Sequence, residues 1–524
     1  MQEFIRNVKN NELGRMSATW TYMLLSVAFV ALNFCTLKNL LPWIDEVMLL
    51  DTAYNAAFRG IWETTAWYRV AGQTPFSTYP PLYQWLIAVW MRLFGGSLVA
   101  ARSLNLIFTF ALGAASLRLL KRRGMRLTHG SVAVFSLLLW GTCEMAWMYR
   151  NGRPDVLCAL LTVLTFLALD SCLFDCGQQE VKRMAVVVCS AALVCAGLQA
   201  GVYLLTCWTY IFIVWKERRR DVARLLCHVL TGFLLGGIIV SLFMFAHGRL
   251  MVFVCSVVPY SSTLSRAALH VLPWMGKVLG FSVARYTTKL LELQTDAGIC
   301  ESLASATEYR SFYVLASIAL AALLCRYKRH IRKLIRDTGF LTLLFAAFVP
   351  VAMNLAGRFT EYYRWMMFLP LLGVVVSISC KSSVWRVVFV VAAVVLSFSG
   401  VRSMLPSSDR NYSRMCEFVR RQSIKQTDAV VCPFALFYEM KPMCETCYFV
   451  GIYPTEYVQR VDYIIEATDG NRTDQPIVAY RRQLMADTTM VLTAIDSLEQ
   501  PPLKIYRVKK KLSRAENKLL QVGI

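Results

Sequence analysis

Charged residues are scarce in this chain of 524 residues, of which they make up 17%, whereas hydrophobic residues make up 56% and aromatic residues 12%. Soluble domains usually carry about 25% charged residues. Many separate apolar runs here are long enough to cross a bilayer. The composition therefore excludes an ordinary soluble protein and predicts a membrane protein with several spans.

Acidic residues are also few relative to basic ones, and the formal net charge is +23. The basic residues lie in short clusters between apolar runs, which argues against nucleic acid as a partner. The segments 121–126, 175–183, 216–224, 326–337 and 381–386 together hold 19 Lys and Arg against 5 acids. The positive-inside rule places these five segments on the cytoplasmic side of the membrane.

The first apolar run, 18–41, lacks the small-residue cleavage pattern of a signal peptide and is too long for one. It predicts a retained first span with the N-terminus in the cytoplasm. Ten further spans are predicted, at roughly 98–119, 130–149, 155–173, 184–200, 202–215, 226–246, 311–325, 338–356, 365–380 and 386–402. The expected fold class is an all-α polytopic membrane protein of about eleven transmembrane helices.

An odd number of spans puts the last segment, 403–524, outside the cytoplasm. It holds 17 Lys and Arg against 14 acids, a nearly balanced surface. The residues 415–422 have a helical pattern, whereas 428–434, 462–467 and 503–508 are typical of strands. These patterns predict a small extracytoplasmic α/β or α+β domain with its own core.

Four cysteines of this last domain, Cys416, Cys432, Cys444 and Cys447, would lie in an oxidising space, which predicts one or two disulfides. Cys444 and Cys447 form a C-x-x-C pair, a spacing also found in metal and redox sites. A second pair and a nearby histidine are lacking, so a structural disulfide is the preferred interpretation.

Two predicted extracytoplasmic loops, 42–97 and 247–310, are too long to be simple connectors, and long loops on a helical scaffold often carry function. In the first loop, apolar residues recur at helical spacing over 46–59, and Gly60 follows as a C-cap. This pattern predicts an amphipathic helix lying on the membrane. The short apolar segment 80–96 predicts a second interfacial helix.

Three carboxylates, Asp45, Glu46 and Asp51, follow the first span directly. A helix N-cap, the position expected for Asp45, requires only one of them, and an ion costs roughly 2.5–3.5 kcal/mol at the bilayer centre and less near the interface. Asp155 follows Pro154 at the head of another predicted span, on the same membrane face. Taken singly, capping accounts for Asp45 and Asp155, but the joint placement of these acids favours a functional site.

The resemblance of the chain to a known family rests on three motifs in order. These are "IDE" after the first span, the segment 79–105, and "YRNGRPDVL" at 149–157. Together they resemble the GT-C glycosyltransferases that use polyprenyl-phosphate sugars, and in particular the protein O-mannosyltransferases and the aminoarabinose transferases of lipid A. The resemblance covers roughly the first 215 residues, with 357–370 as a fainter match. It implies a catalytic membrane domain over 1–402, in a bacterial inner membrane.

The resemblance implies an inverting transfer of a sugar from a polyprenyl-phosphate donor to a hydroxyl or phosphate on a lipid, protein or glycan. In it, Asp45 is the base, Glu46 lies beside it, and Asp155 is a second acid near the sugar. The same three acids would hold a divalent ion, Mg²⁺, Mn²⁺ or Zn²⁺, that bridges to the donor phosphate. His247 and His270 are alternative ligands, although an ordinary polar role in the second loop explains both.

Cationic support for the leaving phosphate is expected from residues at predicted extracytoplasmic helix ends, because guanidinium groups bind phosphate bidentately. Such arginines equally anchor helices by snorkelling. The predicted donor-phosphate residues are Arg150, Arg153, Arg358, Tyr363 and Arg364.

A polytopic transporter or lipid flippase of envelope glycan precursors is the alternative hypothesis, because charges in a membrane body would serve such a protein as well. Transporters usually show an internal repeat or charges deep in their spans, and the sequence shows no repeat and few such charges. A non-catalytic assembly protein would leave the acids of the first loop unexplained.

Overall fold

The computed structural model describes most of the chain. The described residues are 2–42, 44–66, 79–175, 177–198, 200–201, 203–204, 207, 211, 219–248, 250, 253, 310–327, 330–335, 337–355, 364–405, 411–450, 461–467, 475–486, 490–500 and 502–510. The chain forms two compact units. The first comprises Met1–Cys35, Ser77–Leu86 and Arg102–Met404, and the second comprises Thr36–Phe76, Ile87–Ala101 and Leu405–Ile524.

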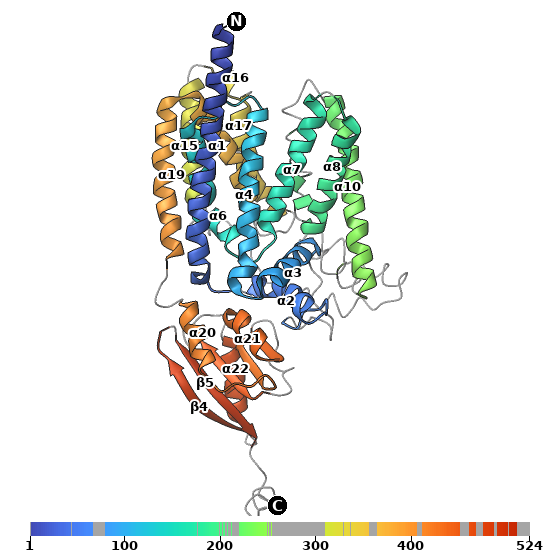
Figure 1. The fold of residues 1–524 in the computed structure, drawn as a ribbon, viewed down its shortest axis with the longest axis vertical. Coiled ribbons are helices and arrows are strands. Elements are labelled where there is room, and N and C mark those ends of the chain that lie inside the picture. The colour runs from blue at the N-terminus through green and yellow to red at the C-terminus, as the bar shows by residue number, and fades with distance from the viewer. Residues whose placement is uncertain are drawn as a thin grey trace, which may run out of the picture. The chain divides into compact units, whose positions relative to one another are not determined.

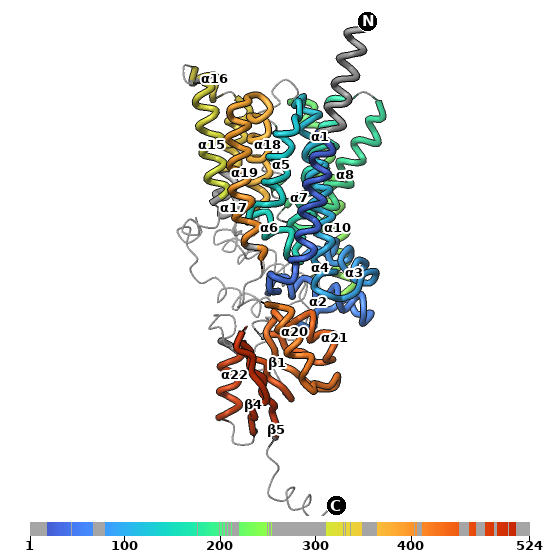
Figure 2. Tube along the Cα trace, turned by 60° about the vertical axis from the view of Figure 1, so that its left-hand side comes forward, coloured from blue at the N-terminus to red at the C-terminus, as the bar shows by residue number. Residues whose placement is uncertain are grey.

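The first unit is helical, and its long helices run side by side (Figure 1, Figure 2). Its helices are α1 (Gln2–Thr36), α4 (Leu98–Arg122), α5 (His129–Gly141), α6 (Cys143–Tyr149), α7 (Asp155–Phe174), α8 (Gln179–Ala196), α10 (Arg219–Ala246), α15 (Arg310–Tyr327), α16 (Ile331–Ile335), α17 (Thr338–Leu355), α18 (Trp365–Lys381) and α19 (Ser383–Met404). Of these, α1 and α4 begin or end in the second unit.

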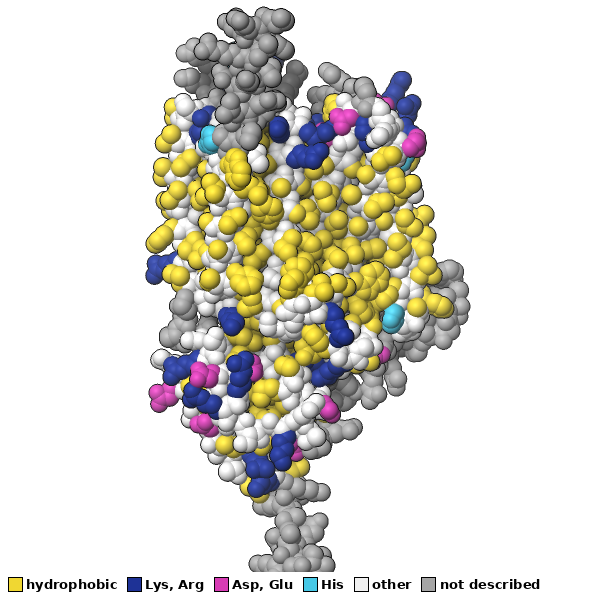
Figure 3. All heavy atoms as spheres, in the orientation of Figure 1, with side chains coloured by type: hydrophobic (Ala, Val, Ile, Leu, Met, Phe, Trp, Pro, Cys, Tyr) yellow, Lys and Arg dark blue, Asp and Glu magenta, His cyan; other side chains and the backbone are white. Residues whose placement is uncertain are grey.

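Several of these helices are apolar enough to cross a membrane. Among the described residues, five are long enough for a span, and a bent pair raises the number to six. Three shorter apolar helices lie within α15, α17 and α18. Hydrophobic side chains cover the middle of the helical part, and Lys and Arg lie mainly outside this band (Figure 3). The protein is therefore a membrane protein, as predicted, and the number of about eleven spans stays a prediction.

The predicted span 130–149 is not one straight helix, because this segment forms two helices, α5 and α6, that meet at an angle of 61° and make either a broken span or a re-entrant loop. The backbone at Thr142 is extended, which ends α5. At the break, side-chain hydroxyls donate hydrogen bonds to backbone carbonyl groups. The Thr142 hydroxyl donates to the Leu138 carbonyl at 2.8 Å, and the Tyr149 hydroxyl donates to the Trp140 carbonyl. Such replacements let a helix break where water is absent.

The second unit contains a five-stranded mixed sheet in the order β2-β1-β3-β5-β4. β1 pairs in parallel with β2 and β3, and β5 pairs antiparallel with β3 and β4. The strands are β1 (Ala429–Pro433), β2 (Thr446–Val450), β3 (Tyr463–Ala467), β4 (Met490–Leu498) and β5 (Leu503–Lys510), and the helices of this part are α20 (Tyr412–Arg420), α21 (Phe437–Met443) and α22 (Gln475–Ala486). The predicted helix and all three predicted strands are confirmed.

One side of this sheet has a small apolar core with α22. It contains the fully or nearly buried side chains of Val431, Ile464, Ile477, Tyr480 and Val508. The cysteines of this domain are all free thiols. The predicted disulfides among Cys416, Cys432, Cys444 and Cys447 are therefore wrong for this structure, in which all four thiols are buried and Cys447 Sγ donates to the Met440 carbonyl at 3.4 Å.

Most of the first loop also belongs to the second unit, including most of α3, whereas its segment Ser77–Leu86 belongs to the first. The two predicted interfacial helices are confirmed as α2 (Ile44–Phe58) and α3 (Leu82–Phe94). The sequence predicted Asp45 as the N-cap of this helix. This is wrong, because α2 begins at Ile44 and Asp45 lies in its first turn. Gly60 adopts a left-handed conformation with φ of +69° and follows the end of α2. Arg92 Nη1 donates to the Ala57 carbonyl at 2.9 Å, which ties α3 to α2.

Candidate functional site

The predicted site residues fall into the two units. Asp45 and Glu46 lie on α2 in the second unit, whereas Arg150, Arg153, Asp155 and Arg364 lie in the first unit. Arg358, Tyr363 and His270 lie outside the described residues. The predicted meeting of Asp45 with Asp155 joins the two units and stays a prediction.

Two of the three acids on α2 are fully buried and contact the C-terminal domain. The Tyr438 hydroxyl donates to Glu46 Oε1 at 3.3 Å. Lys441 Nζ, also from α21, lies 2.5 Å from Asp51 Oδ1, with side-chain exposures of 2% for Lys441 and 0% for Asp51. The sequence offers no local signal for this ion pair, because the partners lie at opposite ends of the chain.

The other carboxylate oxygen of Asp51 holds the segment that follows α2. Asp51 Oδ2 accepts hydrogen bonds from the Thr64 hydroxyl at 2.8 Å, the Thr65 N–H at 2.5 Å and the Ala66 N–H at 2.8 Å. A buried carboxylate needs such a complete set of partners. Asp51 therefore has a structural role. The sequence had suggested instead that this carboxylate belongs to a functional site.

Asp45 differs from both of its neighbours on α2. It is half-buried, whereas Glu46 and Asp51 are fully buried. It lies in the first turn of the helix, where the helix dipole favours negative charge. Of the acids on α2, Asp45 is thus the one whose side chain reaches the surface of the second unit.

A buried polar loop joins α6 to α7 in the first unit. Arg150, Asn151, Arg153 and Asp155 are all buried. Asn105 of α4 organises this loop, because its Nδ2 donates to the Asn151 carbonyl at 2.6 Å and to the Arg153 carbonyl at 3.1 Å. The loop is therefore held in one conformation by side-chain amide contacts to its backbone.

A second buried arginine, Arg102, acts electrostatically on Arg150 of this loop. Arg150 Nη1 donates to Asn33 Oδ1 at 3.2 Å. Burial, together with the charge of the fully buried Arg102, lowers the pKa of Arg150 to about 10, although Tyr149 acts in the opposite direction. Arg150 remains charged at neutral pH, so this end of the unit carries concentrated positive charge. Arg102 was not among the predicted site residues, and its position inside the predicted span 98–119 was the signal for it.

Arg153 and Asp155 form an ion pair with each other. Arg153 Nε lies 2.8 Å from Asp155 Oδ2, with side-chain exposures of 3% and 5%. The pair borders a hollow of about 10 Å³, which also touches Tyr79 and Trp365. A hollow of this size holds about one water molecule, so a donor phosphate at Arg153 would have to separate this pair.

The predicted metal ligands Asp45, Glu46 and Asp155 are divided between the two units, so the metal site stays a prediction. Among the described residues, no group of three or more His, Cys, Asp or Glu side chains is suited to a metal ion. Asp155 is paired with Arg153 and Glu46 contacts Tyr438, so two of the three predicted ligands have other partners. His247, the other candidate described, is exposed, and its Nδ1 lies 2.8 Å from the Phe243 carbonyl. No step of the reaction is therefore assigned to a metal.

Arg364 directly precedes α18, whose first turn is fixed by an unusual contact. Pro370 lies inside α18 and has no N–H to donate to the Met366 carbonyl. The Tyr203 hydroxyl donates to that carbonyl instead, at 2.8 Å, and the Tyr203 ring packs edge-on against Trp365 at 5.2 Å. Trp365 and Met366 border the hollow beside Asp155, and Arg364 directly precedes them in the chain.

Comparison with known proteins gives the fold. No protein-family model matches the sequence, and no curated protein matches it. Among solved structures, ArnT from Cupriavidus metallidurans in the apo state is 14% identical, with 94% of this chain and 98% of that chain covered and a TM-score of 0.44. The oligosaccharyltransferase AglB from Archaeoglobus fulgidus, in complex with an inhibitory peptide and a dolichol-phosphate, is 12% identical, with 94% and 74% covered and a TM-score of 0.51.

A third structure is the arabinofuranosyltransferase AftD from Mycobacteria, which is 11% identical, with 94% of this chain and 40% of that chain covered and a TM-score of 0.50. At such low identity the similarity shows the fold alone, and the AglB and AftD structures carry that conclusion. The chain shares its fold with these two transferases, as the resemblance of its motifs to the GT-C enzymes predicted.

Proposed function

We propose that the protein is an integral-membrane glycosyltransferase that moves a sugar from a polyprenyl-phosphate donor to a hydroxyl or phosphate group of a lipid, protein or glycan acceptor. The fold supports this proposal, and AglB, which shares the fold, is an oligosaccharyltransferase whose structure was solved in complex with a dolichol-phosphate. The expected setting is a bacterial inner membrane crossed about eleven times, with the N-terminus in the cytoplasm and the C-terminal domain and the active site outside it.

The observation that carries the proposal is the difference between Asp45 and its neighbours on α2. Glu46 and Asp51 contact Tyr438 and Lys441, whereas Asp45 is half-buried in the first turn. A general base needs partial dehydration and access to the acceptor together. Asp45 is the acid of α2 that combines both, and α2 itself is held in place by the contacts of its two buried neighbours.

In the proposed reaction, the Asp45 carboxylate accepts the proton of the acceptor hydroxyl. The acceptor oxygen attacks the anomeric carbon of the sugar, and the bond between that carbon and the phosphate oxygen breaks. The anomeric configuration inverts, because a single displacement takes place. The bond electrons leave with the polyprenyl phosphate, so its negative charge increases as the new bond forms.

The departing phosphate requires cations that stay charged throughout the reaction. Arg150 and Arg102 supply a buried pair of guanidinium groups in the first unit, and Arg364 adds a third near the start of α18. Buried guanidinium groups act strongly on an anion, because little water screens them. Arg153 is a further candidate once a ligand separates it from Asp155.

The test is to delete the protein, identify by mass spectrometry which envelope glycoconjugate loses a sugar, and restore the gene with Asp45→Asn. We expect the variant to insert normally and to lose transfer by about 10²- to 10⁴-fold. Asp221→Asn is the matched control, because Asp221 is an exposed first-turn acid on α10. Full activity of Asp45→Asn would remove Asp45 from the mechanism. Accumulation of a complete precursor on the cytoplasmic side would favour the flippase hypothesis instead.

A further inference from the structure

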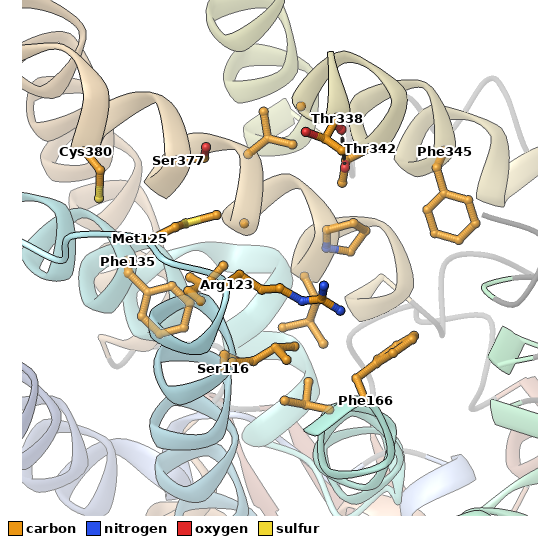
Figure 4. A pocket seen from close by; sticks show the side chains of 18 of the residues that line it. Ser116, Arg123, Met125, Phe135, Phe166, Thr338, Thr342, Phe345, Ser377 and Cys380 are labelled. Carbon is orange, nitrogen blue, oxygen red and sulfur yellow. Dashed lines mark hydrogen bonds between the residues drawn. The ribbon is translucent and has the colours of Figure 1, made fainter. Parts of the chain in front are cut away.

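A large cavity lies inside the first unit, and its lining does not include Asp155. Its volume is about 690 Å³, within the range of about 300–1,000 Å³ that small-molecule sites occupy. It is bounded by α4, α5, α7, α17 and α18 (Figure 4). Figure 4 shows the Arg123 side chain extending into a space flanked by Phe135, Phe166 and Phe345.

The cavity is separate from the hollow beside Asp155, although α18 lines both. Trp365 and Met366, at the start of α18, border the hollow, whereas lining residues from Leu369 to Lys381 border the cavity. Trp365 and Lys381 stand at opposite ends of the helix, roughly 24 Å apart at a rise of 1.5 Å per residue. The basic end of the cavity thus lies a full helix length from the loop that carries Arg150 and Arg153.

The charges around the cavity are of one sign. Among the described lining residues, the charged side chains are Arg123, Arg126 and Lys381, and no carboxylate lines the space. The two nearest acids have structural partners. Asp170 lies 2.8 Å from Arg122 and 2.9 Å from Arg123, and Asp337 accepts the Gly339 N–H at 2.8 Å. Asp170 thus offsets part of the charge of Arg123. Arg126 and Lys381 are therefore the lining cations that we consider as partners of a bound anion.

The walls of the cavity are mainly apolar. Leucine, phenylalanine, valine and isoleucine contribute nine of the 25 lining residues, and methionine, proline and cysteine contribute another four. A free phosphate would bind the cations and leave these walls unfilled, whereas a hydrocarbon chain would fill the walls and leave the cations without a counter-charge. An apolar chain joined to a phosphate satisfies both parts, and basic pockets between membrane helices bind anionic lipid headgroups.

We propose that this cavity binds one acyl chain of an anionic glycerophospholipid, with the headgroup phosphate at Arg126 and Lys381. Both residues lie in the basic segments 121–126 and 381–386, so the lipid enters from the membrane leaflet that borders them. That leaflet is the cytoplasmic one by the positive-inside rule. The site is independent of sugar transfer and would exist in a transporter as well.

The test uses the purified full-length chain and native mass spectrometry with phosphatidylglycerol or phosphatidylethanolamine added. We expect phosphatidylglycerol to bind more tightly, and Arg126→Gln combined with Lys381→Gln to weaken its binding at least about tenfold. Arg224→Gln is the matched control, because Arg224 is an exposed arginine on α10 outside the cavity. It should bind the lipid as the unchanged protein does.

A second variant tests the apolar part of the site. A side-chain carbon added at Gly373 would meet only Leu120 Cδ2, at 3.8 Å, so Gly373→Leu extends into the cavity without a clash at its first atom. This variant should lose lipid binding while Arg126 and Lys381 are intact, and circular dichroism should show unchanged helix content. Its failure to reduce binding would show that the chain lies elsewhere.

Three results would overturn the proposal. Equal binding of the two phospholipids would remove the role of the headgroup charge, and unchanged binding in the glutamine variant would remove the two cations. Displacement of phosphatidylglycerol by polyprenyl phosphate, at one molecule for one, would assign the cavity to the sugar donor. Displacement by inorganic phosphate alone would show that the apolar walls contribute nothing.

Discussion

Lys441 Nζ lies 2.5 Å from Asp51 Oδ1, and both side chains are shut off from solvent. Lys441 belongs to α21 of the C-terminal domain and Asp51 to α2 of the first loop, so the contact joins the two segments within the second unit. Arg59 adds to it, because its Nη2 donates to the Lys441 carbonyl at 3.2 Å and the Cys444 carbonyl at 3.4 Å. The C-terminal domain therefore holds the helix on which Asp45 lies.

Removing the cation should destabilise the second unit. Lys441→Ala leaves the buried Asp51 carboxylate without its counter-charge, which costs about 3–5 kcal/mol for a buried pair. We expect a lower unfolding temperature of the purified protein in detergent, measured by intrinsic fluorescence, and a matching loss of transfer activity because α2 loses its support.

The double variant Lys441→Met with Asp51→Leu separates charge from packing. The apolar pair removes the unpaired charge but leaves the Thr65 and Ala66 N–H groups without their acceptor, so this protein should unfold at a temperature between those of Lys441→Ala and the original protein. Sugar transfer should return with it, because neither side chain takes part in the chemistry. An inactive but stable double variant would mean that Asp51 itself acts in the reaction.

Arg364→Ala should weaken use of the lipid donor more than it affects folding. A hydrogen bond to a charged group contributes about 1.5–3 kcal/mol, so we expect KM for the polyprenyl-phosphate sugar to rise at least about tenfold. The measurement is initial-rate kinetics in detergent with varied donor. Arg402→Ala, which removes an arginine from the last turn of α19, is the control, and an unchanged KM in Arg364→Ala would count against a phosphate role.

Tyr203→Phe should destabilise α18 through the backbone of Met366. Without the hydroxyl, the Met366 carbonyl loses the donor that stands in for the N–H absent from Pro370. Hydrogen bonds of this kind within membranes are worth about 1–2 kcal/mol, which thermal unfolding can detect. In a Pro370→Ala background the helix regains its own N–H, so there the same change should cost much less. An equal cost in both backgrounds would contradict this account.

The four cysteines of the C-terminal domain should be free. Alkylation in denaturant without reductant should therefore label Cys416, Cys432, Cys444 and Cys447 completely, as read by peptide mass spectrometry. Labelling that requires prior reduction would show that the predicted disulfides do form.

Cys444 and Cys447 should also differ in their pH dependence. The Cys447 thiol donates a hydrogen bond to Cys444, which lowers the pKa of Cys444, whereas this bond and burial raise the pKa of Cys447. As pH rises, thiolate therefore forms first at Cys444. Brief alkylation of the folded protein at increasing pH should modify Cys444 before Cys447, slowly at both because the two side chains are buried. The reverse order would contradict the hydrogen-bond direction.

Local patterns predicted the elements whose own residues specify them. The helices α2 and α3 follow from apolar side chains that recur every three to four residues, and β1, β3 and β5 from short apolar runs between turn residues. β4 was not predicted, because most of its side chains are exposed and show little alternation. The break between α5 and α6 was also missed, since both halves are apolar. The side chains of Thr142 and Tyr149 supply the hydrogen bonds that the carbonyl groups at the break accept.

The sequence by itself determined that this is a membrane protein, that it resembles the GT-C transferases, and that acids and arginines are the residues to consider for chemistry. Only the tertiary structure decided which of them have structural roles. Asp51 pairs with Lys441, Asp155 pairs with Arg153, and Arg102 joins Arg150. The physical reason is that composition and periodicity act between near neighbours in the chain, whereas the partner of a buried charge is chosen by how distant segments pack.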